Sequence, residues 1–211
     1  MLGDNGIYIK ENIIMNKMLV VVDMQNDFID GVLGSPEAQA IVPKVVERIK
    51  QAIDNDEIIF LTKDTHYQQD YLDTEEGKNL PIPHCIFGTK GWNINKDIYN
   101  ETSKRYNNTF HLPKFTFGEC WDKYIFTYYD EQEEKEVSLF FDIETKNIKE
   151  IEIIGLDTDF CVLANATTLK AAFPNAHIII NAECCAGSTP EWHEKALEML
   201  EHCHCEIINR K

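Results

Sequence analysis

Three side chains from distant parts of the chain could together perform nucleophilic catalysis. Cys161 stands behind two acids in the stretch GLDTDFCV. A carboxylate beside a thiol opposes the thiolate form, so a reactive Cys161 needs a positive charge from elsewhere. Lys114 in TFHLPK could supply that charge, and Asp23 in MLVVVD could hold the lysine and accept the thiol proton. Cys161 also opens a predicted helix, whose positive end favours a thiolate. Considered one at a time, each residue has an ordinary alternative explanation. Cys161 would be a core residue, Lys114 a surface lysine and Asp23 a helix cap or turn residue.

A second set of residues has the types that bind metal ions. Asp64 and His66 are two residues apart after an apolar run, so their side chains project to the same side, and His84 follows in a loop. One carboxylate and two imidazoles suit zinc, iron or manganese, and three protein ligands leave positions open for water or substrate. The alternative is that these histidines only form hydrogen bonds.

The remaining cysteines carry weaker signals. Cys203-His204-Cys205 could bind a soft metal and Cys184-Cys185 could form a redox pair, but packing near the last strand explains both better. Seven cysteines at irregular spacing are not a disulfide framework. We therefore expect reduced thiols and a cytoplasmic protein.

Short apolar runs alternate with segments of helical period. The runs lie at 18–23, 57–64, 150–155 and 177–181, with a weaker one at 205–209. They lack polar alternation, as expected for strands buried on both faces. The pattern predicts an α/β fold of three layers, with a mostly parallel sheet and helices on both of its faces.

The helical segments have recognisable boundaries. Aliphatic residues between 42 and 53 fall on one helical face, with Pro43 as a first-turn residue or a local kink. A second helix should follow Cys161 and stop at Pro174. Thr189-Pro190 should cap a third, which ends near residue 202.

The middle of the chain is harder to interpret. Residues 67–108 are rich in turn signals and too long for a simple connection, which indicates functional loops. Residues 124–146 fit either a helix followed by a strand or a hairpin. We expect an N-terminal extension over residues 1–17, ordered or disordered, and a single domain over residues 18–211.

The acidic balance limits the partners. Of the 211 residues, 36 are Asp or Glu and 20 are Lys or Arg, a net charge of −16. Such a surface repels phosphate backbones and anionic lipid. No apolar window approaches the length of a membrane span. We expect a small-molecule substrate, no nucleic acid and no membrane.

The candidate residues should meet at one edge of the sheet. Asp23 and Asp64 end apolar runs, Lys114 ends another short one, and the run at 150–155 leads into the Cys161 stretch. In open parallel sheets, ligands bind beyond the carboxyl ends of the strands, near the point where strand order reverses. This edge is therefore the expected active site.

The motifs resemble those of the isochorismatase-like cysteine hydrolases, in particular their nicotinamidase-related branch. VVVDMQNDF, LPKFTFG and TDFCV match the segments that carry the catalytic aspartate, lysine and cysteine, and DTH with PHCIFGTKGW matches the metal segments. The resemblance covers residues 18–208 in order, with a poor match around 120–148. It implies a six-stranded, mostly parallel α/β sheet.

The resemblance also implies an activity. Cys161 would attack a small amide such as nicotinamide, with Asp23 and Lys114 as partners, a thioester acyl-enzyme as intermediate, and ammonia released. The backbone N–H groups of Asp157 and Cys161 would form an oxyanion hole, with a cis peptide before Asp157. One divalent metal, zinc first and iron or manganese as alternatives, would be held by Asp64, His66 and His84. The resemblance also leaves open whether the protein forms homo-oligomers, since relatives often self-associate.

Two departures from the family pattern concern the substrate. Pro81 stands where nicotinamidases usually carry a tryptophan that stacks on the pyridine ring. Phe28 keeps the other aromatic wall, and Trp92 or Tyr67 could replace the lost one. Asp157 is acidic where the family usually has a small residue, which disfavours anionic substrates.

Two alternatives to a nicotinamide-type amidase remain. One is an isochorismatase-like hydrolase that acts on another small substrate. The other is a non-catalytic thiol or metal protein.

Overall fold

The computed structural model describes residues 16–105, 109–119, 121, 124–130, 135–141 and 148–210. Most of the predicted N-terminal extension, residues 1–15, lies outside this range. The first strand begins at Lys17, and the backbone carbonyl of Asn16 accepts hydrogen bonds from the N–H groups of Lys149 and Glu150. The described chain therefore begins at the start of this strand, bonded to the backbone at Lys149 and Glu150.

Six strands form one sheet, in which every neighbouring pair is parallel. Their order is β3-β2-β1-β6-β7-β8. The strands are β1 (Lys17–Val22), β2 (Ile58–Asp64), β3 (Thr109–Lys114), β6 (Glu150–Leu156), β7 (His177–Ala186) and β8 (Glu206–Ile208). The chain builds outward from β1 in one direction and then from β6 in the other, so strand order reverses between these two. The predicted α/β sheet, including its weak last strand, is confirmed.

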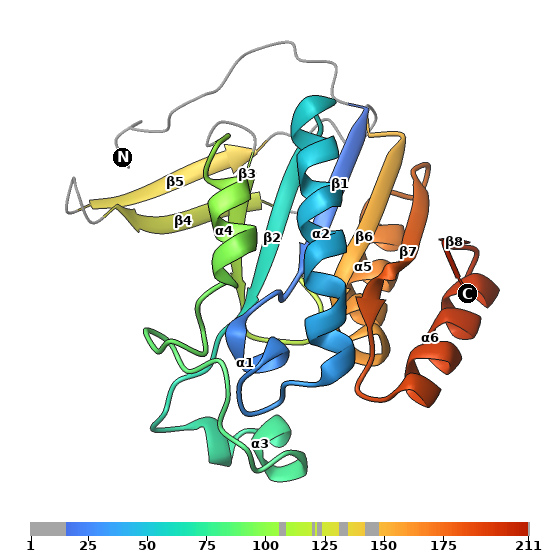
Figure 1. Cartoon of the computed structure of the whole chain (residues 1–211). Coiled ribbons are helices and arrows are strands. Elements are labelled where there is room, and N and C mark those ends of the chain that lie inside the picture. The colour runs from blue at the N-terminus through green and yellow to red at the C-terminus, as the bar shows by residue number, and fades with distance from the viewer. Residues whose placement is uncertain are drawn as a thin grey trace.

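Helices cover both faces of the sheet and complete three layers (Figure 1). They are α2 (Pro36–Asp54) and α4 (Lys96–Thr102) on one face, and α5 (Leu163–Ala172) and α6 (Pro190–His202) on the other. Along β1, Met18, Val20 and Val22 pack with α5 and α6, whereas Leu19 and Val21 pack with α2 and α4. Because both faces of β1 are buried, its run is continuously apolar.

Side-chain caps start the long helices. The Ser35 hydroxyl accepts the Ala38 N–H at 3.0 Å, and Pro36 occupies the first turn of α2. Pro43 lies inside this helix, so the first-turn interpretation of Pro43 is wrong. That place belongs to Pro36, whose preset φ suits a helix start. In α6 the Thr189 hydroxyl accepts the Trp192 N–H at 3.1 Å, as the Thr-Pro pair predicts.

The turn-rich segment 67–108 is more helical than the sequence suggests. Besides α4 it contains the short 3₁₀ helix η1 (Tyr71–Asp73) and α3 (Glu75–Asn79). These pieces, together with α1 (Asn26–Ile29), lie below the sheet in Figure 1. The segment leaves the sheet at the carboxyl end of β2 and leads to β3.

The two interpretations of residues 124–146 are resolved in favour of a hairpin. β4 (Tyr124–Asp130) and β5 (Lys135–Phe141) pair antiparallel, with Tyr124 opposite Phe141 and Asp130 opposite Lys135. This pair is separate from the six-stranded sheet. No helix within the described ranges is both long and apolar enough to cross a bilayer.

The α2 face of the core gives a direct test of the packing. Ile49 is completely buried between α2 and the sheet. We expect Ile49→Ala to lower the free energy of unfolding by about 2–5 kcal/mol, because it removes buried methyl groups and leaves a cavity. Urea denaturation measures this. The exposed neighbour Glu47 supplies the control, and Glu47→Ala should change stability by less than about 0.5 kcal/mol. Equal effects of the two substitutions would contradict the packing.

Candidate active site

Four adjacent strands, β3, β2, β1 and β6, bring residues at or just beyond their carboxyl ends to one place. Asp23 directly follows β1, Asp64 ends β2, and Lys114 ends β3. Cys161 lies in the π-helical turn Thr158–Val162, which follows β6 and leads into α5. This is the carboxyl edge of the sheet, the lower end in Figure 1. The predicted convergence is therefore observed.

Lys114 is the centre of the group. Its Nζ lies 3.4 Å from Cys161 Sγ, 2.8 Å from Asp23 Oδ2 and 3.2 Å from Asp64 Oδ1. The side chain is only 1% exposed. Burial alone lowers the pKa of an ammonium, but Asp23, Cys161 and Asp64 raise the pKa of Lys114 well above its ordinary value. Lys114 therefore stays charged inside the protein.

Asp23 is held in a fixed orientation. Thr62 Oγ1 donates to Asp23 Oδ1 at 2.7 Å and accepts the Asp23 N–H at 3.1 Å. The backbone of Asp23 is left-handed, with φ of 46°, which aspartate tolerates better than most residues. Burial raises the pKa of the Asp23 carboxyl, Lys114 lowers it and Asp64 raises it, with a net increase. A raised pKa makes this carboxylate a better proton acceptor.

Cys161 carries its proton in the resting site. Burial raises the pKa of the thiol, Lys114 lowers it, and Asp23 and Asp64 raise it, so that it lies well above the ordinary value. The same balance includes a hydrogen bond between the thiol and Asp23. Asp159 points away from the sulfur, because its carboxylate accepts both the backbone N–H and the hydroxyl of Ser188. Lys114 stabilises the thiolate, but this effect is smaller than the opposing effects of burial and the two carboxylates.

A second cluster adjoins the first and shares Asp64 with it. Asp64, His66, Glu76 and His84 each offer one ligand atom, and these atoms all lie within 4.8 Å of one another. His66 Nε2 lies 2.9 Å from Asp64 Oδ2, and His84 Nε2 lies 3.4 Å from the same oxygen. Glu76 Oε1 is 3.5 Å from His66 Nε2 and 3.4 Å from His84 Nε2. The structure thus brings the three predicted ligands together.

Glu76 is the member that the sequence analysis missed. It lies in α3, within an EEGK stretch that has the composition of an exposed helix. Thr74 caps this helix by accepting the Gly77 N–H at 2.9 Å. A side chain on Gly77 would collide with the backbone carbonyl of Tyr71, so glycine lets α3 approach closely. The capped start followed by glycine is the signal that could have identified Glu76.

Outer contacts orient His84 for ligation. The backbone carbonyl of Ile82 lies 2.9 Å from His84 Nδ1. In the neutral ring, Nδ1–H donating to this carbonyl leaves the Nε2 lone pair free for a metal ion. Tyr71 packs edge-on against both histidine rings, and its hydroxyl donates to the Leu80 carbonyl at 2.7 Å. Two imidazoles and two carboxylates, largely buried, fit zinc, iron or manganese.

Gln25 is a further positioning residue that the sequence analysis did not single out. Its amide oxygen accepts the Asp64 N–H at 2.7 Å, and its amide nitrogen donates to the Asp64 carbonyl at 2.9 Å. A second bond from the same nitrogen reaches the Trp92 carbonyl at 2.9 Å. The side chain is completely buried and holds the backbone of Asp64 in place. Its position two residues after Asp23 was the available signal.

Phe28, the predicted aromatic wall, lies beside the metal cluster. Phe28 is buried and meets the His84 ring edge-on, with centroids 5.4 Å apart. The face of Trp92 is covered by the Lys63 ammonium, and its Nε1 donates to Thr65 Oγ1 at 3.0 Å. Trp92 is thus engaged by neighbours in this loop.

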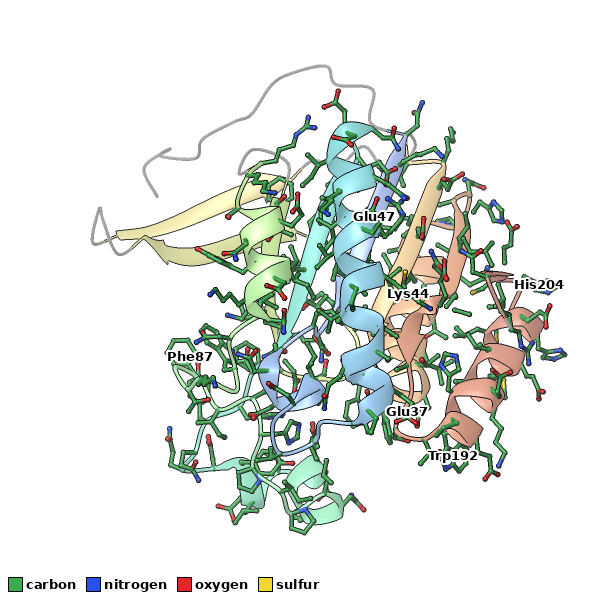
Figure 2. The ribbon with its side chains drawn as sticks, in the orientation of Figure 1. Glu37, Lys44, Glu47, Phe87, Trp192 and His204 are labelled. Carbon is green, nitrogen blue, oxygen red and sulfur yellow. The ribbon has the colours of Figure 1, made fainter. Side chains whose placement is uncertain are left out.

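Tyr67 stacks on another ring of the protein. Its centroid lies 6.2 Å from that of Phe115, with 17° between the planes. Phe87 lies 6.0 Å from Tyr67 and projects outward from the loop (Figure 2). Tyr67 and Trp92 as replacements for the second aromatic wall stay predictions.

The protonation of the two histidines predicts how the cluster takes up metal. Burial lowers the pKa of each ring, but hydrogen bonds to Asp64 and Glu76 raise it overall, to about 9 for His66 and about 10 for His84. Both rings are therefore imidazolium at pH 7 in metal-free protein, and metal binding must release their protons. Zinc affinity should rise between pH 6 and pH 9, by up to about 100-fold per pH unit for two protons.

Competition with a chromogenic chelator measures this affinity. His66→Ala should bind zinc more weakly and with a shallower pH dependence, whereas His204→Ala, which changes an exposed histidine, should match the wild type. Equal zinc binding by His66→Ala and the wild type would exclude the cluster as the site.

Comparison with known proteins agrees with this geometry. The Isochorismatase domain family model matches residues 17–211. The uncharacterized isochorismatase family protein PncA of Bacillus subtilis is 29% identical, with 87% of this chain and 93% of the relative aligned. The nicotinamidase of Schizosaccharomyces pombe is 26% identical over 92% of this chain and 93% of its own length.

Solved structures show the same fold. The nicotinamidase/pyrazinamidase PncA from Bacillus subtilis superposes with a TM-score of 0.69 at 25% identity, covering 92% of this chain and 99% of that one. A pyrazinamidase of Pyrococcus horikoshii in complex with zinc gives a TM-score of 0.67 at 23% identity, with 92% and 99% covered. Since the family model spans nearly the whole chain, the protein belongs to the isochorismatase family.

Proposed function

We propose that this protein is a metal-assisted cysteine amidohydrolase, which cleaves nicotinamide to nicotinate and ammonia, or cleaves a similar small amide. The observation that carries the proposal is the buried Lys114 ammonium, 3.4 Å from Cys161 Sγ and 2.8 Å from the Asp23 carboxylate. Such a group can polarise a thiol next to a proton acceptor. The similarity to named nicotinamidases adds support.

In the proposed first half-reaction, Cys161 gives its proton to Asp23 as the sulfur attacks the amide carbonyl carbon. A C–S bond forms, and the carbonyl oxygen becomes an oxyanion. The backbone N–H groups of Asp157 and Cys161 would donate to it, each contributing about 3 kcal/mol by analogy with other acyl-transfer sites. The peptide bond between Leu156 and Asp157 is cis, as the family resemblance implies.

Collapse of this intermediate would break the C–N bond. Asp23 returns its proton to the nitrogen, ammonia leaves, and a thioester remains on Cys161. Water then attacks the thioester while Asp23 takes a proton from it, and the carboxylic acid product departs. The proton returns to the sulfur, which restores the resting site. Lys114 stays charged throughout and stabilises each anionic sulfur state.

The metal cluster would hold the substrate rather than break its bond. Asp64, His66, Glu76 and His84 would bind one divalent ion, and zinc is supported by the donor set and by the zinc-bound Pyrococcus horikoshii relative. When bound, the ion would supply a Lewis-acid contact for a ring nitrogen, directly or through water. Phe28, beside His84, would form one wall of the ring pocket.

A different small amide is the alternative within the same chemistry. Pro81 offers no ring face, and Asp157 introduces a carboxyl group beside the proposed oxyanion hole. A substrate with fewer aromatic contacts fits these two positions. We propose one hydrolase domain over residues 18–211 in the cytoplasm, where the free cysteines of the described residues would stay reduced.

The nucleophile assignment has a direct test. We expect Cys161→Ala to lower the rate of ammonia release by at least about 1,000-fold, because it removes the thiol that lies within hydrogen-bonding distance of Lys114. Cys203→Ala, which changes a partly exposed cysteine, should retain wild-type activity. Ammonia is measured with nicotinamide and then with a panel of small amides.

Three outcomes separate the hypotheses. Release from another amide, but not from nicotinamide, would leave the mechanism and change the substrate. Undiminished release by Cys161→Ala would remove the nucleophile. No release from any amide by the wild type would favour a non-catalytic thiol or metal protein.

Asp157 predicts a pH-dependent preference among substrates. Burial, Asp159 and Asp23 raise the pKa of the Asp157 carboxyl to about 7. It is therefore neutral below pH 7 and negative above, where it should repel an anionic substrate. The ratio of kcat/KM for a carboxylate-bearing pyridine amide to that for nicotinamide should fall about tenfold from pH 6 to pH 8. Asp157→Asn should make the ratio constant, and an unchanged fall in this variant would contradict the role.

A further inference from the structure

The turn that carries Cys161 is also held by a segment outside the catalytic and metal groups. Its partner is the segment 187–193, which joins β7 to α6 and includes the first turn of that helix. We call this the supporting segment. None of its residues belongs to the proposed catalytic or metal groups, so its contacts need a separate explanation.

Two consecutive side chains of the turn bind the supporting segment. Thr158 Oγ1 lies 2.8 Å from His193 Nδ1, and Thr158 is completely buried. Asp159 Oδ1 accepts the Ser188 N–H at 2.8 Å, and Asp159 Oδ2 accepts the Ser188 hydroxyl at 2.5 Å. Both contacts lie within three residues of Cys161.

Gly187 permits this close approach. A Cβ atom at Gly187 would lie 2.7 Å from Asp159 Oδ1 and 2.9 Å from His193 Cα. Any side chain there would push the supporting segment away from the turn. The contacts are therefore tight packing, in which a small displacement of one side is transmitted to the other.

Hydrogen bonds also hold the turn on either side of the nucleophile. The Asp157 carbonyl accepts the N–H groups of Phe160 at 3.1 Å and Val162 at 3.0 Å. On the α5 side, Asn165 Nδ2 donates to the Cys161 carbonyl at 2.8 Å. Thr158 lies between these anchors, directly after the residue whose N–H is proposed for the oxyanion hole. Its side-chain bond fixes the start of the turn.

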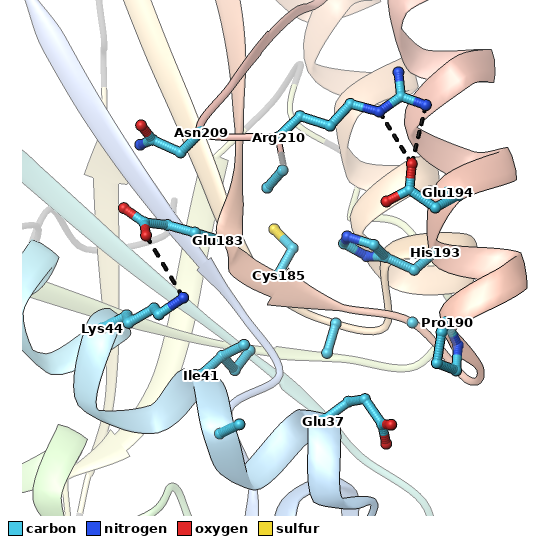
Figure 3. A pocket seen from close by; sticks show the side chains of 14 residues that line it. Glu37, Ile41, Lys44, Glu183, Cys185, Pro190, His193, Glu194, Asn209 and Arg210 are labelled. Carbon is cyan, nitrogen blue, oxygen red and sulfur yellow. Dashed lines mark hydrogen bonds and ion pairs between the residues drawn. The ribbon is translucent and has the colours of Figure 1, made fainter.

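His193 faces a groove on its other side. The groove has a volume of about 320 Å³ and lies between α2, β7 and α6, with the His193 ring and the Cys185 thiol pointing into it (Figure 3). Glu37 and Lys44 of α2 form the opposite rim (Figures 2 and 3). Lys44 Nζ lies 3.5 Å from Glu183 Oε2, so these two charges form an ion pair.

The hydrogen-bonding of His193 is correspondingly simple. Within the described ranges, the bond to Thr158 is the only one made by its ring. Burial lowers the pKa of His193, which keeps the imidazole neutral and able to donate or accept at Nδ1 according to its tautomer.

We propose that His193 is a positioning residue for the nucleophile, acting through its hydrogen bond to the Thr158 hydroxyl. The bond holds the start of the turn so that the Cys161 sulfur stays beside Lys114 and the Asp157 N–H keeps its direction. Without it, the buried hydroxyl has no hydrogen-bond partner among the residues that the structure describes, and the turn shifts. This inference rests on the proposed function of Cys161.

Substitutions can separate positioning from simple packing. His193→Leu removes the ring nitrogen, and Thr158→Val removes the hydroxyl while keeping the branched shape. Either should lower kcat about 10- to 100-fold, with KM changed less than about threefold, since small misplacements act on the reacting geometry. The double variant should be no slower than the slower single variant, because both remove the same bond.

The conservative variant and a matched control sharpen the test. His193→Asn places an amide group where Nδ1 stood, so it should keep kcat within about threefold of the wild type. His202→Leu changes an exposed histidine of the same helix and should have no effect. Thermal unfolding of each variant ensures that activity is compared below its Tm.

Alkylation of Cys161 by iodoacetamide, followed by mass spectrometry of its peptide, gives a second readout that needs no amide substrate. It should slow in His193→Leu and Thr158→Val and stay near the wild-type rate in His193→Asn. Equal rates in all variants, or a loss in His193→Leu alone, would overturn the inference. If wild-type protein releases no ammonia from any amide, the proposed function fails, and alkylation still decides whether His193 positions Cys161.

Discussion

The site depends on one buried ammonium group. Transferring a charged amine from water into a protein interior costs several kcal/mol, and Lys114 is almost completely enclosed. Asp23 and Asp64 offset that cost at 2.8 and 3.2 Å, and both come from the ends of neighbouring strands. Because β1, β2 and β3 pair side by side, both carboxylates lie next to Lys114 and stabilise its buried charge. Removing either carboxylate would leave a charge without adequate compensation.

Asp64 ties the two halves of the site together. One oxygen faces Lys114, and the other faces His66 and His84. The backbone of this residue is in turn gripped at both its N–H and its carbonyl by Gln25. Charge at the histidines thus reaches the thiol through Asp64 and then Lys114, a path of three contacts. A change at the histidine cluster therefore also changes the electrostatic environment of the thiol.

The sequence predicted the features that local patterns determine. Unbroken apolar runs located the strands, and the rule that ligands lie beyond the carboxyl ends brought Asp23, Asp64 and Lys114 to one edge. Glu76 was missed because its stretch is indistinguishable from an exposed helix until Gly77 is seen beneath Tyr71. Pro43 was assigned to the first turn, although α2 begins at Pro36, seven residues or about two turns earlier. The meeting of Glu76 with the two histidines depends on packing between segments, whereas the start of α2 has a local signal in the Ser35-Pro36 pair.

The order of the strands has a consequence for how the chain acquires its site. β1 lies beside β6, so Lys17 pairs with Glu150 across most of the chain. Contacts between such distant residues close large loops, and parallel sheets rich in them form slowly. Asp23, Asp64 and Lys114 can gather as soon as the first three strands associate, but the thiol arrives only when the β1–β6 seam closes. Closure of the β1–β6 seam is thus the step that brings the sulfur to the ammonium group.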